Sequence, residues 1–223
     1  MKLVWSPETA SKAYIDTVKA CELYRESGVA ELISATAAGW NAKLIVETWT
    51  QGGALTTSIG LAIASRHACG LHVCIVPDES SRSEYAQAMS EAGLSPEVIV
   101  GDAEKVMVES SLVDGIDFLV VDCRGRDFAR PLTLAKLSQR GAVLVCKNAS
   151  SRSASSFRWR SVLDGGYRLV RTAFLPVGNG LDIAHVAAPN GGGAVHGATS
   201  VKRGRRWFKH VDQNSGEEHV IRT

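Results

Sequence analysis

The sequence has little of what an extracellular or membrane protein carries. Its five cysteines are an odd number and none stands in a CxxC pair, so neither a disulfide framework nor a zinc site is expected. No stretch approaches the roughly 18 uninterrupted apolar residues of a membrane span, and the first residues lack the apolar run of a secretory signal. We therefore expect a soluble, unsecreted protein without a membrane partner. The expected compartment is the cytoplasm, with the nucleus as a further candidate.

Most of the chain also has almost no net charge. Residues 1–189 hold 19 Lys and Arg against 20 Asp and Glu, whereas residues 190–223 hold 6 against 3. A nearly neutral body gives no reason to expect a broad nucleic-acid face. The tail motif KRGRRWFKH resembles a nucleic-acid or nuclear-import patch, although basic runs of this kind are more often simply solvated.

The order of hydrophobic patterns predicts the fold. Two helices are expected within residues 1–40, the first capped by Ser6. Five continuous runs rich in Val and Ile then predict strands buried on both faces, with segments of helical period between them. Two final strand-like runs joined only by GN predict an antiparallel hairpin. The strand runs are KLIVET, LHVCIV, PEVIV, IDFLVV, GAVLVC, GYRLVRTAFLPV and GLDIAHVAA.

This alternation predicts an α/β protein with a Rossmann-like, doubly wound, mostly parallel seven-stranded sheet. The C-terminal hairpin is antiparallel, and helices cover both faces. Residues 1–189 form this domain. Residues 190–223 are expected to be a flexible basic tail, with a short strand or hairpin around RRWFKHV.

Acidic residues gather at the predicted carboxyl ends of the strands, where doubly wound sheets bind ligands. Four of the five central strand ends carry an acid within two residues. Such a ring of carboxylates suits a ligand that offers hydroxyl groups and an amine. Asp78 or Glu79 stands where a carboxylate can accept both ribose hydroxyls. The strand-end residues are Glu47, Asp78 with Glu79, Asp102, Asp122, and Lys147 with Asn148.

These motifs together resemble the class I S-adenosylmethionine (SAM) methyltransferases, in particular the small catechol and caffeoyl-CoA O-methyltransferase type. The resemblance covers about residues 28 to 187. It rests on LIVETWTQGGALTTSIGLAIA, EYAQAMSEAGLSPEVIVGDAEKVM, IDFLVVDC, AVLVCKN and LPVGNGLDIAHV. More narrowly, WSPETASKAYIDTVKACE and AAGWNAKLIVETW resemble an uncharacterised plant family described only as Rossmann-like, which implies a fold and no established activity.

The resemblance implies a SAM site in which each strand end contacts one part of the cofactor. Its glycines let the backbone approach the ligand closely. The implied contacts are Glu47, Thr48, Gly52 and Gly53 for the methionine end; Asp78 and Glu79 for the ribose; Gly101, Asp102 and Ala103 for the adenine; and Asp122 for the sulfonium or its amino group.

Two departures from this family pattern bear on function. Trp49 stands where the family usually has the first loop glycine, and the loop is about two residues longer, so an indole could fill part of the cofactor space. The metal-dependent relatives supply an aspartate at the fourth strand and an Asp-Asn pair after the fifth, where this sequence has Asp122, Lys147 and Asn148. An ammonium opposes a divalent cation, so we predict no bound metal.

Asp122, Lys147 and Asn148 are the candidate catalytic residues. Lys147 could stabilise a phenolate by its charge or, uncharged, remove the proton itself. A structural ion pair with Asp122 is the commoner role for such a lysine.

Three functions are open from the sequence. The leading hypothesis is a SAM-binding, metal-independent methyltransferase-like protein that acts on a small acceptor, with phenols as one candidate class. The alternative is a non-catalytic Rossmann-like binding or regulatory module, and the third is an RNA-associated protein that uses the basic tail. The position of Trp49 separates the first two, because an indole inside the cofactor cleft would favour the non-catalytic module.

Overall fold

The computed structural model describes residues 5–24, 28–125, 127–163, 167–187, 207–211 and 218–222. The chain divides into two compact units, residues 1–189 and residues 190–223. In the second unit, Trp207–Val211 (β8) pairs antiparallel with Glu218–Arg222 (β9), and a strand was expected at this place. The rest of the tail, which the sequence predicts to be flexible, lies outside the described residues.

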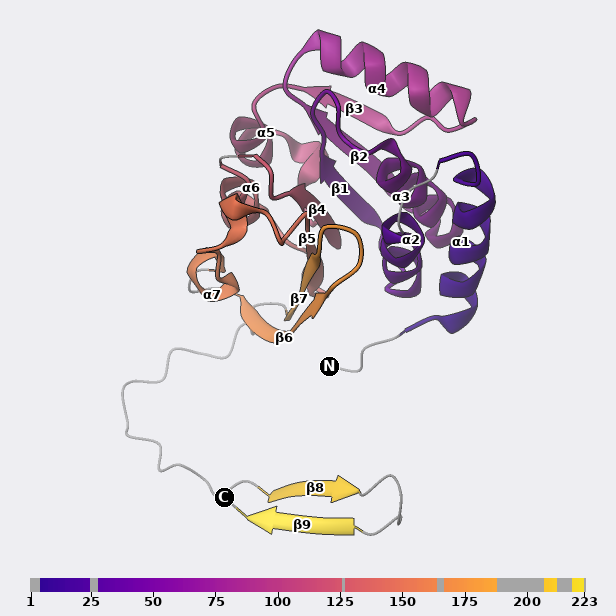
Figure 1. The fold of residues 1–223 in the computed structure, drawn as a ribbon. Coiled ribbons are helices and arrows are strands. Elements are labelled where there is room, and N and C mark those ends of the chain that lie inside the picture. The colour runs from indigo at the N-terminus through magenta and orange to yellow at the C-terminus, as the bar shows by residue number, and fades with distance from the viewer. Residues whose placement is uncertain are drawn as a thin grey trace. The chain divides into compact units, whose positions relative to one another are not determined.

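The first unit holds a seven-stranded sheet, as predicted (Figure 1). The strand order is β3-β2-β1-β4-β5-β7-β6, in which β1 to β5 run parallel and β7 lies antiparallel to both β5 and β6. The expected hairpin is therefore present. The strands are Leu44–Thr48 (β1), Leu71–Val76 (β2), Glu97–Val100 (β3), Phe118–Asp122 (β4), Ala142–Lys147 (β5), Arg168–Leu175 (β6) and Leu181–Ala187 (β7).

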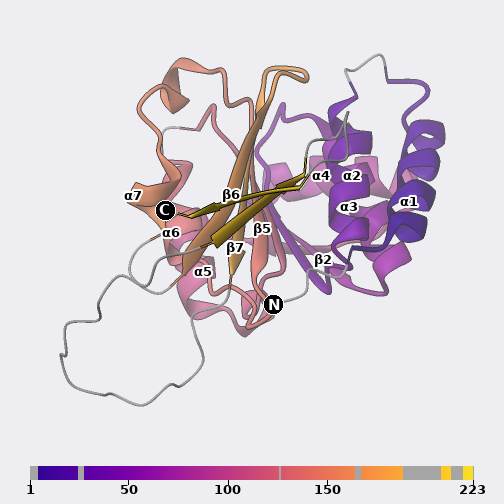
Figure 2. The ribbon, with the colours of Figure 1, turned by 90° about the horizontal axis from the view of Figure 1, so that it is seen from below.

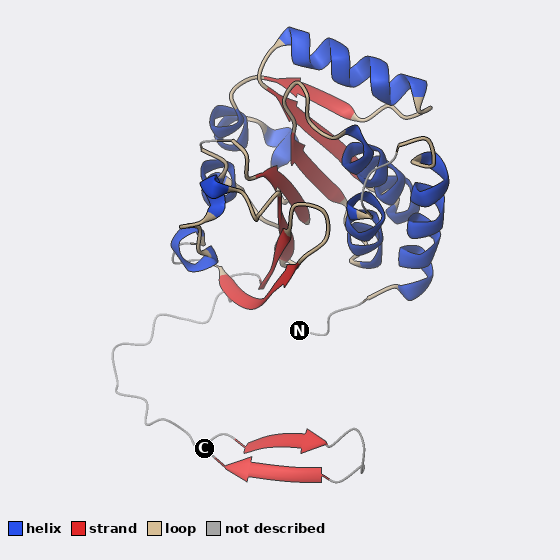
Figure 3. Cartoon of the chain, viewed as in Figure 1, coloured by secondary structure: helices blue, strands red, loops and turns tan. Residues whose placement is uncertain are grey.

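Helices cover both faces of this sheet (Figures 2 and 3). Helix α3 is buried on nearly every side, and α1 and α2 pack over it. Helices α5, α6 and α7 lie on the opposite face. The helices are Pro7–Ala20 (α1), Val29–Gly39 (α2), Leu55–Ala68 (α3), Glu79–Glu91 (α4), Ala103–Glu109 (α5), Ala129–Leu134 (α6) and Trp159–Val162 (α7). None of these described helices is long and apolar enough to cross a membrane.

One predicted helix is shorter than its sequence pattern suggests. The segment 129–140 has helical period, yet α6 ends at Leu134. Beyond it, Leu137 forms a parallel bridge with Ile116, and the carbonyl of Lys136 accepts hydrogen bonds from the backbone N–H groups of Gly115 and Ile116 at 2.9 Å each. Pairing with the chain before β4 therefore overrides the helical propensity of this segment.

Strand alternation decides which strand-end side chains share a face of the sheet. Ile45, Val120 and Val145 contribute to the core under α1, α2 and α3. Because side chains alternate along a strand, Glu47, Asp122 and Lys147, each two residues further on, project from the same face. The fold thus brings three charged side chains from β1, β4 and β5 to one side of one sheet edge.

Candidate functional site

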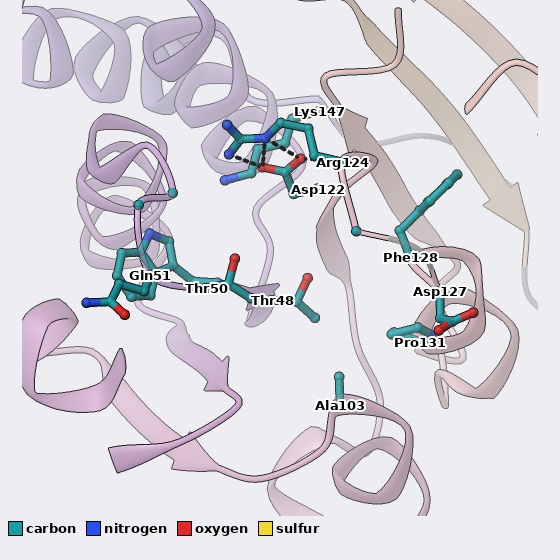
Figure 4. Close-up of a pocket in the computed structure, with 14 residues that line it drawn as sticks. Thr48, Thr50, Gln51, Ala103, Asp122, Arg124, Asp127, Phe128, Pro131 and Lys147 are labelled. Carbon is teal, nitrogen blue, oxygen red and sulfur yellow. Dashed lines mark hydrogen bonds and ion pairs between the residues drawn. The ribbon is translucent and has the colours of Figure 1, made fainter. Parts of the chain in front are cut away.

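A cavity of about 490 Å³ opens at the carboxyl ends of β1 and β4 (Figure 4). Its volume falls within the roughly 300 to 1,000 Å³ that is usual for ligand pockets. The loop after β1 forms one wall, and the segment after β4 forms another. The lining residues are 48–53, Ala103, Asp122, Arg124, Gly125, Asp127, Phe128, Pro131 and Lys147.

Trp49 does not plug this cavity. Its side chain is 2% exposed, belongs to the core under α1, α2 and α3, and lies with its ring centroid 5.4 Å from that of Tyr85. A Cβ at Gly53 would come within 2.7 Å of Trp49 Nε1, whereas one at Gly52 would meet nothing within 4 Å. Gly53 therefore makes room for the indole behind the loop, while Gly52, at φ +75°, makes the turn beside the open cavity.

Glu47 lies in the helix layer and not in the cavity lining. Its carboxylate is fully buried, and Oε1 accepts a hydrogen bond from the hydroxyl of Tyr85 at 2.8 Å and lies 3.1 Å from Nε2 of His72. Burial alone would raise the pKa of Glu47, but the hydrogen bond and charge of His72 and the charge of Lys147 outweigh it and lower the pKa. The carboxylate expected to contact a methionine end is thus engaged within the core.

The acids that end β2 and β3 also have structural partners. Asp78 caps α4, because its Oδ1 accepts a hydrogen bond from the backbone N–H of Ser81 at 2.7 Å. That contact lowers the pKa of Asp78. Glu79 is exposed and pairs with Arg82 at 3.3 Å, and Asp102 caps α5. The N–H of Gly101 donates to the carbonyl of Val76 at 2.8 Å.

Asp122 faces the cavity with both carboxylate oxygens engaged. Arg124 Nη2 donates to Oδ2 at 2.8 Å, Arg124 Nε donates to Oδ1 at 3.1 Å, and Asn148 Nδ2 donates to Oδ1 at 2.9 Å. Burial would raise the pKa of Asp122, but these hydrogen bonds and the charge of Lys147 lower it. The carboxylate is therefore held ionised, and Figure 4 shows the pair with Arg124 beside Lys147.

Lys147 is 4% exposed, and its side chain has neither a hydrogen bond nor an ion pair with any residue that the structure describes. The ion pair expected between Lys147 and Asp122 is absent, because Arg124 occupies the carboxylate instead. Lys147 also lines a second cavity, of about 180 Å³, at the end of β5. Lys147 is thus a lining residue of both cavities. The second one is lined by Val29, Ala54, Thr57, Lys147, Asn148 and residues 177–181.

The structure brings together only part of the residue set that the sequence predicts. Thr48, Gly52, Gly53, Ala103, Asp122 and Lys147 line the larger cavity, and Asn148 lines the smaller one. Five others lie outside the lining of both: Glu47, Asp78, Glu79, Gly101 and Asp102.

Several cavity residues are not among the site residues that the sequence predicts, and Arg124 and Phe128 are two of them. Arg124 follows the strand end by two residues, and that spacing lets its side chain fold back onto Asp122, a short-range signal that could have been used. Phe128 lines the cavity and packs against Phe157 with ring centroids 5.2 Å apart. It lies in an irregular segment, for which no sequence period predicts a facing direction.

The described residues contain no group of three His, Cys, Asp or Glu side chains that could hold a metal ion. At the position of the aspartate in the Asp-Asn pair, Lys147 presents an ammonium group, which cannot serve as an oxygen ligand for a divalent cation. Metal independence stays a prediction that a titration must test.

Solved structures similar to this chain include methyltransferases. The O-methyltransferase TomG from Streptomyces achromogenes, solved with SAM, is 24% identical and covers 83% of this chain and 92% of its own, with a TM-score of 0.56. An O-methyltransferase from Bacillus cereus, solved with S-adenosylhomocysteine (SAH), is 18% identical, covers 82% and 93%, and has a TM-score of 0.56. A methyltransferase from Geobacter sulfurreducens is 22% identical, covers 81% and 90%, and also has a TM-score of 0.56. At these identities the likeness confirms the fold.

The family to which the chain belongs follows from its sequence. No curated relative matches it. One family model, described as "Protein of unknown function (DUF1442)", matches residues 1–223. This Rossmann-like chain, whose solved structural neighbours include SAM-dependent methyltransferases, therefore belongs to the DUF1442 family.

Proposed function

We propose that this chain is a SAM-binding, metal-independent methyltransferase-like protein that acts on a small acceptor. The observation that carries the proposal is the position of the larger cavity. The chain runs from β1 outward to β2 and β3, then returns to place β4 on the other side of β1. Doubly wound sheets bind nucleotide ligands at such a reversal of strand order. The neighbours solved with SAM or SAH support the same ligand class.

The residues of the larger cavity fit an adenosyl group with a charged amino-acid end. Ala103, Phe128 and Pro131 offer apolar surface to a flat ring, while Thr48 and the backbone after it offer polar groups. The open space at Gly52 lets a ligand approach the backbone. The ionised carboxylate of Asp122 suits the positively charged part of such a ligand, although Arg124 neutralises some of its charge.

Bound SAM would supply a methyl group activated by a positively charged sulfur. The chain's own contribution would be to align the acceptor and to keep water away from it. Lys147 lines both cavities and would stabilise an acceptor oxygen in its anionic form. Asn148 would hold its neighbour Asp122, because it donates a hydrogen bond to that carboxylate.

Binding of SAM and SAH to the full chain is the direct test, by calorimetry and by thermal shift. A ligand at about 100 times its Kd should stabilise the fold by about 2.7 kcal/mol. Ala103→Phe should abolish this binding because the ring enters the cavity. Val108→Phe, on the exposed side of the same helix, should leave it unchanged. No binding of either ligand to the unmodified chain would refute the proposal.

A non-catalytic nucleotide-binding module is the second candidate, and a specific observation favours it. Glu47 is turned into the core and Asp122 is paired with Arg124, so the carboxylates that the resemblance implies for the methionine end and for the sulfonium are already engaged. Such a module would bind SAH and SAM without transferring a methyl group. Radiolabelled SAM incubated with phenolic and acidic acceptors, and with RNA, separates the two candidates by whether any label is transferred.

A further inference from the structure

The smaller cavity is a polar recess built around one buried cation. At about 180 Å³ it has the volume of roughly six water molecules at about 30 Å³ each. Thr57, Asn148 and Asn179 add polar atoms to the lining beside Lys147, while Val29, Val177 and Leu181 add apolar surface. A recess of this size and polarity suits a small molecule with one charged end.

Lys147 acts as a positive charge that lacks a counter-ion contact. Its charge helps to lower the pKa of both Glu47 and Asp122. Neither carboxylate bonds to it, because Tyr85 and His72 engage Glu47, and Arg124 and Asn148 engage Asp122. A buried charge without a bonded partner is unfavourable. A ligand that brings an anionic oxygen to the Nζ atom would remove this penalty.

Beside Lys147, the residues that the structure describes offer no group that can take a proton from an acceptor. Asp122 is engaged by Arg124 and Asn148, and its lowered pKa makes it a poor base. Asp127, the other carboxylate in the lining of the larger cavity, lies beside Pro131, across that cavity from Lys147 (Figure 4). The histidines of residues 1–187 lie elsewhere: His67 bonds to Asp16, His72 to Glu47, and His185 packs against Trp40. The acceptor oxygen must therefore arrive already ionised. At neutral pH a carboxyl group meets this condition, whereas a phenol, with a pKa of about 10, does not.

We propose that the smaller cavity binds the carboxylate of a small organic acid against Lys147, and that the reaction is carboxyl O-methylation. This inference rests on the proposed SAM-dependent function. A carboxylate oxygen uses a lone pair to form the new O–CH₃ bond while the C–S bond of the sulfonium breaks, and the electron pair of that bond stays on sulfur. The products are a methyl ester and SAH, and no proton moves.

Matched acids and amides test the binding site in the full chain. Acetate and benzoate, compared with acetamide and benzamide, differ in charge while keeping nearly the same shape. Calorimetry or ligand-observed NMR at saturating SAH should show acid binding at least about tenfold tighter than amide binding, because a charge-assisted contact is stronger than a neutral one. Phenol should bind as weakly as the amides. Equal affinity for acids and amides, or no acid binding at all, would overturn the inference.

Two variants test whether the acids bind in the smaller cavity. Lys147→Met should reduce benzoate affinity by about tenfold or more, to the level of benzamide. Asn179→Asp places a negative charge in the smaller cavity alone and should also weaken benzoate binding; the melting temperature and SAH affinity are measured beside it, because Asn179 Nδ2 donates a hydrogen bond to Asn148. Lys105→Met, at an exposed lysine, is the control. Benzoate affinity that survives both cavity variants would refute the site.

The proposed cofactor site and the proposed acceptor site can be refuted independently of each other. If SAH binds and the acids do not, the acceptor class is wrong and the cofactor site stands. If the acids bind through Lys147 and SAH does not, the anion site stands and the methylation step is wrong. Transfer of label from SAM to benzoate as an alkali-labile methyl ester would support both.

Discussion

Glu47 and Lys147 are both buried charged side chains at strand ends, and they project from the same face of the sheet, yet they are treated in opposite ways. Glu47 lies among Tyr85, His72 and the helix layer; its Oε1 is engaged by both of these side chains, while its buried Oε2 has no hydrogen-bond partner in the described residues. Lys147 lies between two cavities without a bonded partner in the described part of the chain. The difference teaches that burial alone does not mark a functional charge. The carboxylate of Glu47 is engaged by side chains of its own core, whereas the side chain of Lys147 has no bonded partner and borders space that a ligand can enter.

The largest expected effect tests the structural side of this comparison. Glu47→Ala should lower the free energy of unfolding by about 3 to 5 kcal/mol, because it leaves the buried hydroxyl of Tyr85 and the ring of His72 unpaired. Urea denaturation followed by circular dichroism measures the loss. Glu91→Ala, at an exposed site, should stay within about 0.5 kcal/mol of the unmodified protein. A small loss of stability in Glu47→Ala would show that the contacts of Glu47 contribute little to the fold.

The loop glycines extend the comparison to the cavity wall. Gly53→Ala should cost about 1 to 3 kcal/mol, because the new Cβ would lie 2.7 Å from Trp49 Nε1 and 2.9 Å from the carbonyl oxygen of Thr50. Gly52→Ala should cost about 1 to 2 kcal/mol through its φ of +75° alone. In a Trp49→Phe background, the loss of stability caused by Gly53→Ala should become smaller, whereas the loss caused by Gly52→Ala should stay the same. A double-mutant cycle measures both.

The pH dependence of stability tests whether Glu47 is ionised in the fold. Because the pKa of Glu47 is lowered in the fold from its usual 4.5, its stabilisation is fully present above pH 4.5 and is lost as the pH falls through the lowered value. The stability gap between the unmodified protein and Glu47→Gln should therefore be largest near neutral pH and close below pH 4.5. Glu109→Gln, at an exposed site, should show no such closing gap. A gap that is constant with pH would contradict the ionised state of Glu47.

Lys147→Met should change the free energy of unfolding by less than about 1 kcal/mol, since the gain from replacing an unpaired buried ammonium with an apolar chain is offset by the loss of its charge beside Glu47 and Asp122. Guanidinium denaturation, in the absence of ligand, gives the value. The same variant should bind SAM more tightly relative to SAH, because a cationic wall repels a sulfonium and not a thioether. A loss of stability as large as that of Glu47→Ala would show that Lys147 has a structural partner.

The smallest expected effect concerns Asp78, where the sequence predicts a ribose contact and the structure shows a helix cap. Asp78→Asn should change stability by less than about 0.5 kcal/mol, because Asn caps as well as Asp, whereas Asp78→Ala should lose about 1 kcal/mol. SAH affinity should be unchanged in Asp78→Asn, measured by calorimetry. A clear fall in affinity would assign the carboxylate to the ligand.

The fold was predictable because it depends on patterns that lie close together in the sequence. Continuous runs such as IDFLVV and AVLVC become central strands, and the GN junction becomes the β6–β7 turn. Segment 129–140 shows the limit, since its second half pairs with Ile116, which no local pattern reveals.

The candidate site was only partly predictable, for a related reason. Strand ends locate the cavity, but the direction and partner of each side chain depend on register. His72 and Tyr85 reach Glu47 only because β2 pairs with β1 and α4 returns over the same face. The expected ion pair between Lys147 and Asp122 is not formed, because Arg124, two residues after Asp122, pairs with that carboxylate instead.

The indole of Trp49 also makes the larger cavity observable by optical spectroscopy. It borders the cavity on one side and the ring of Tyr85 on the other, so light absorbed by the tyrosine can be transferred to it. A ligand that enters the cavity changes the surroundings of this emitter directly. Occupancy should therefore be readable as a change in intrinsic fluorescence, without any label on the protein or the ligand.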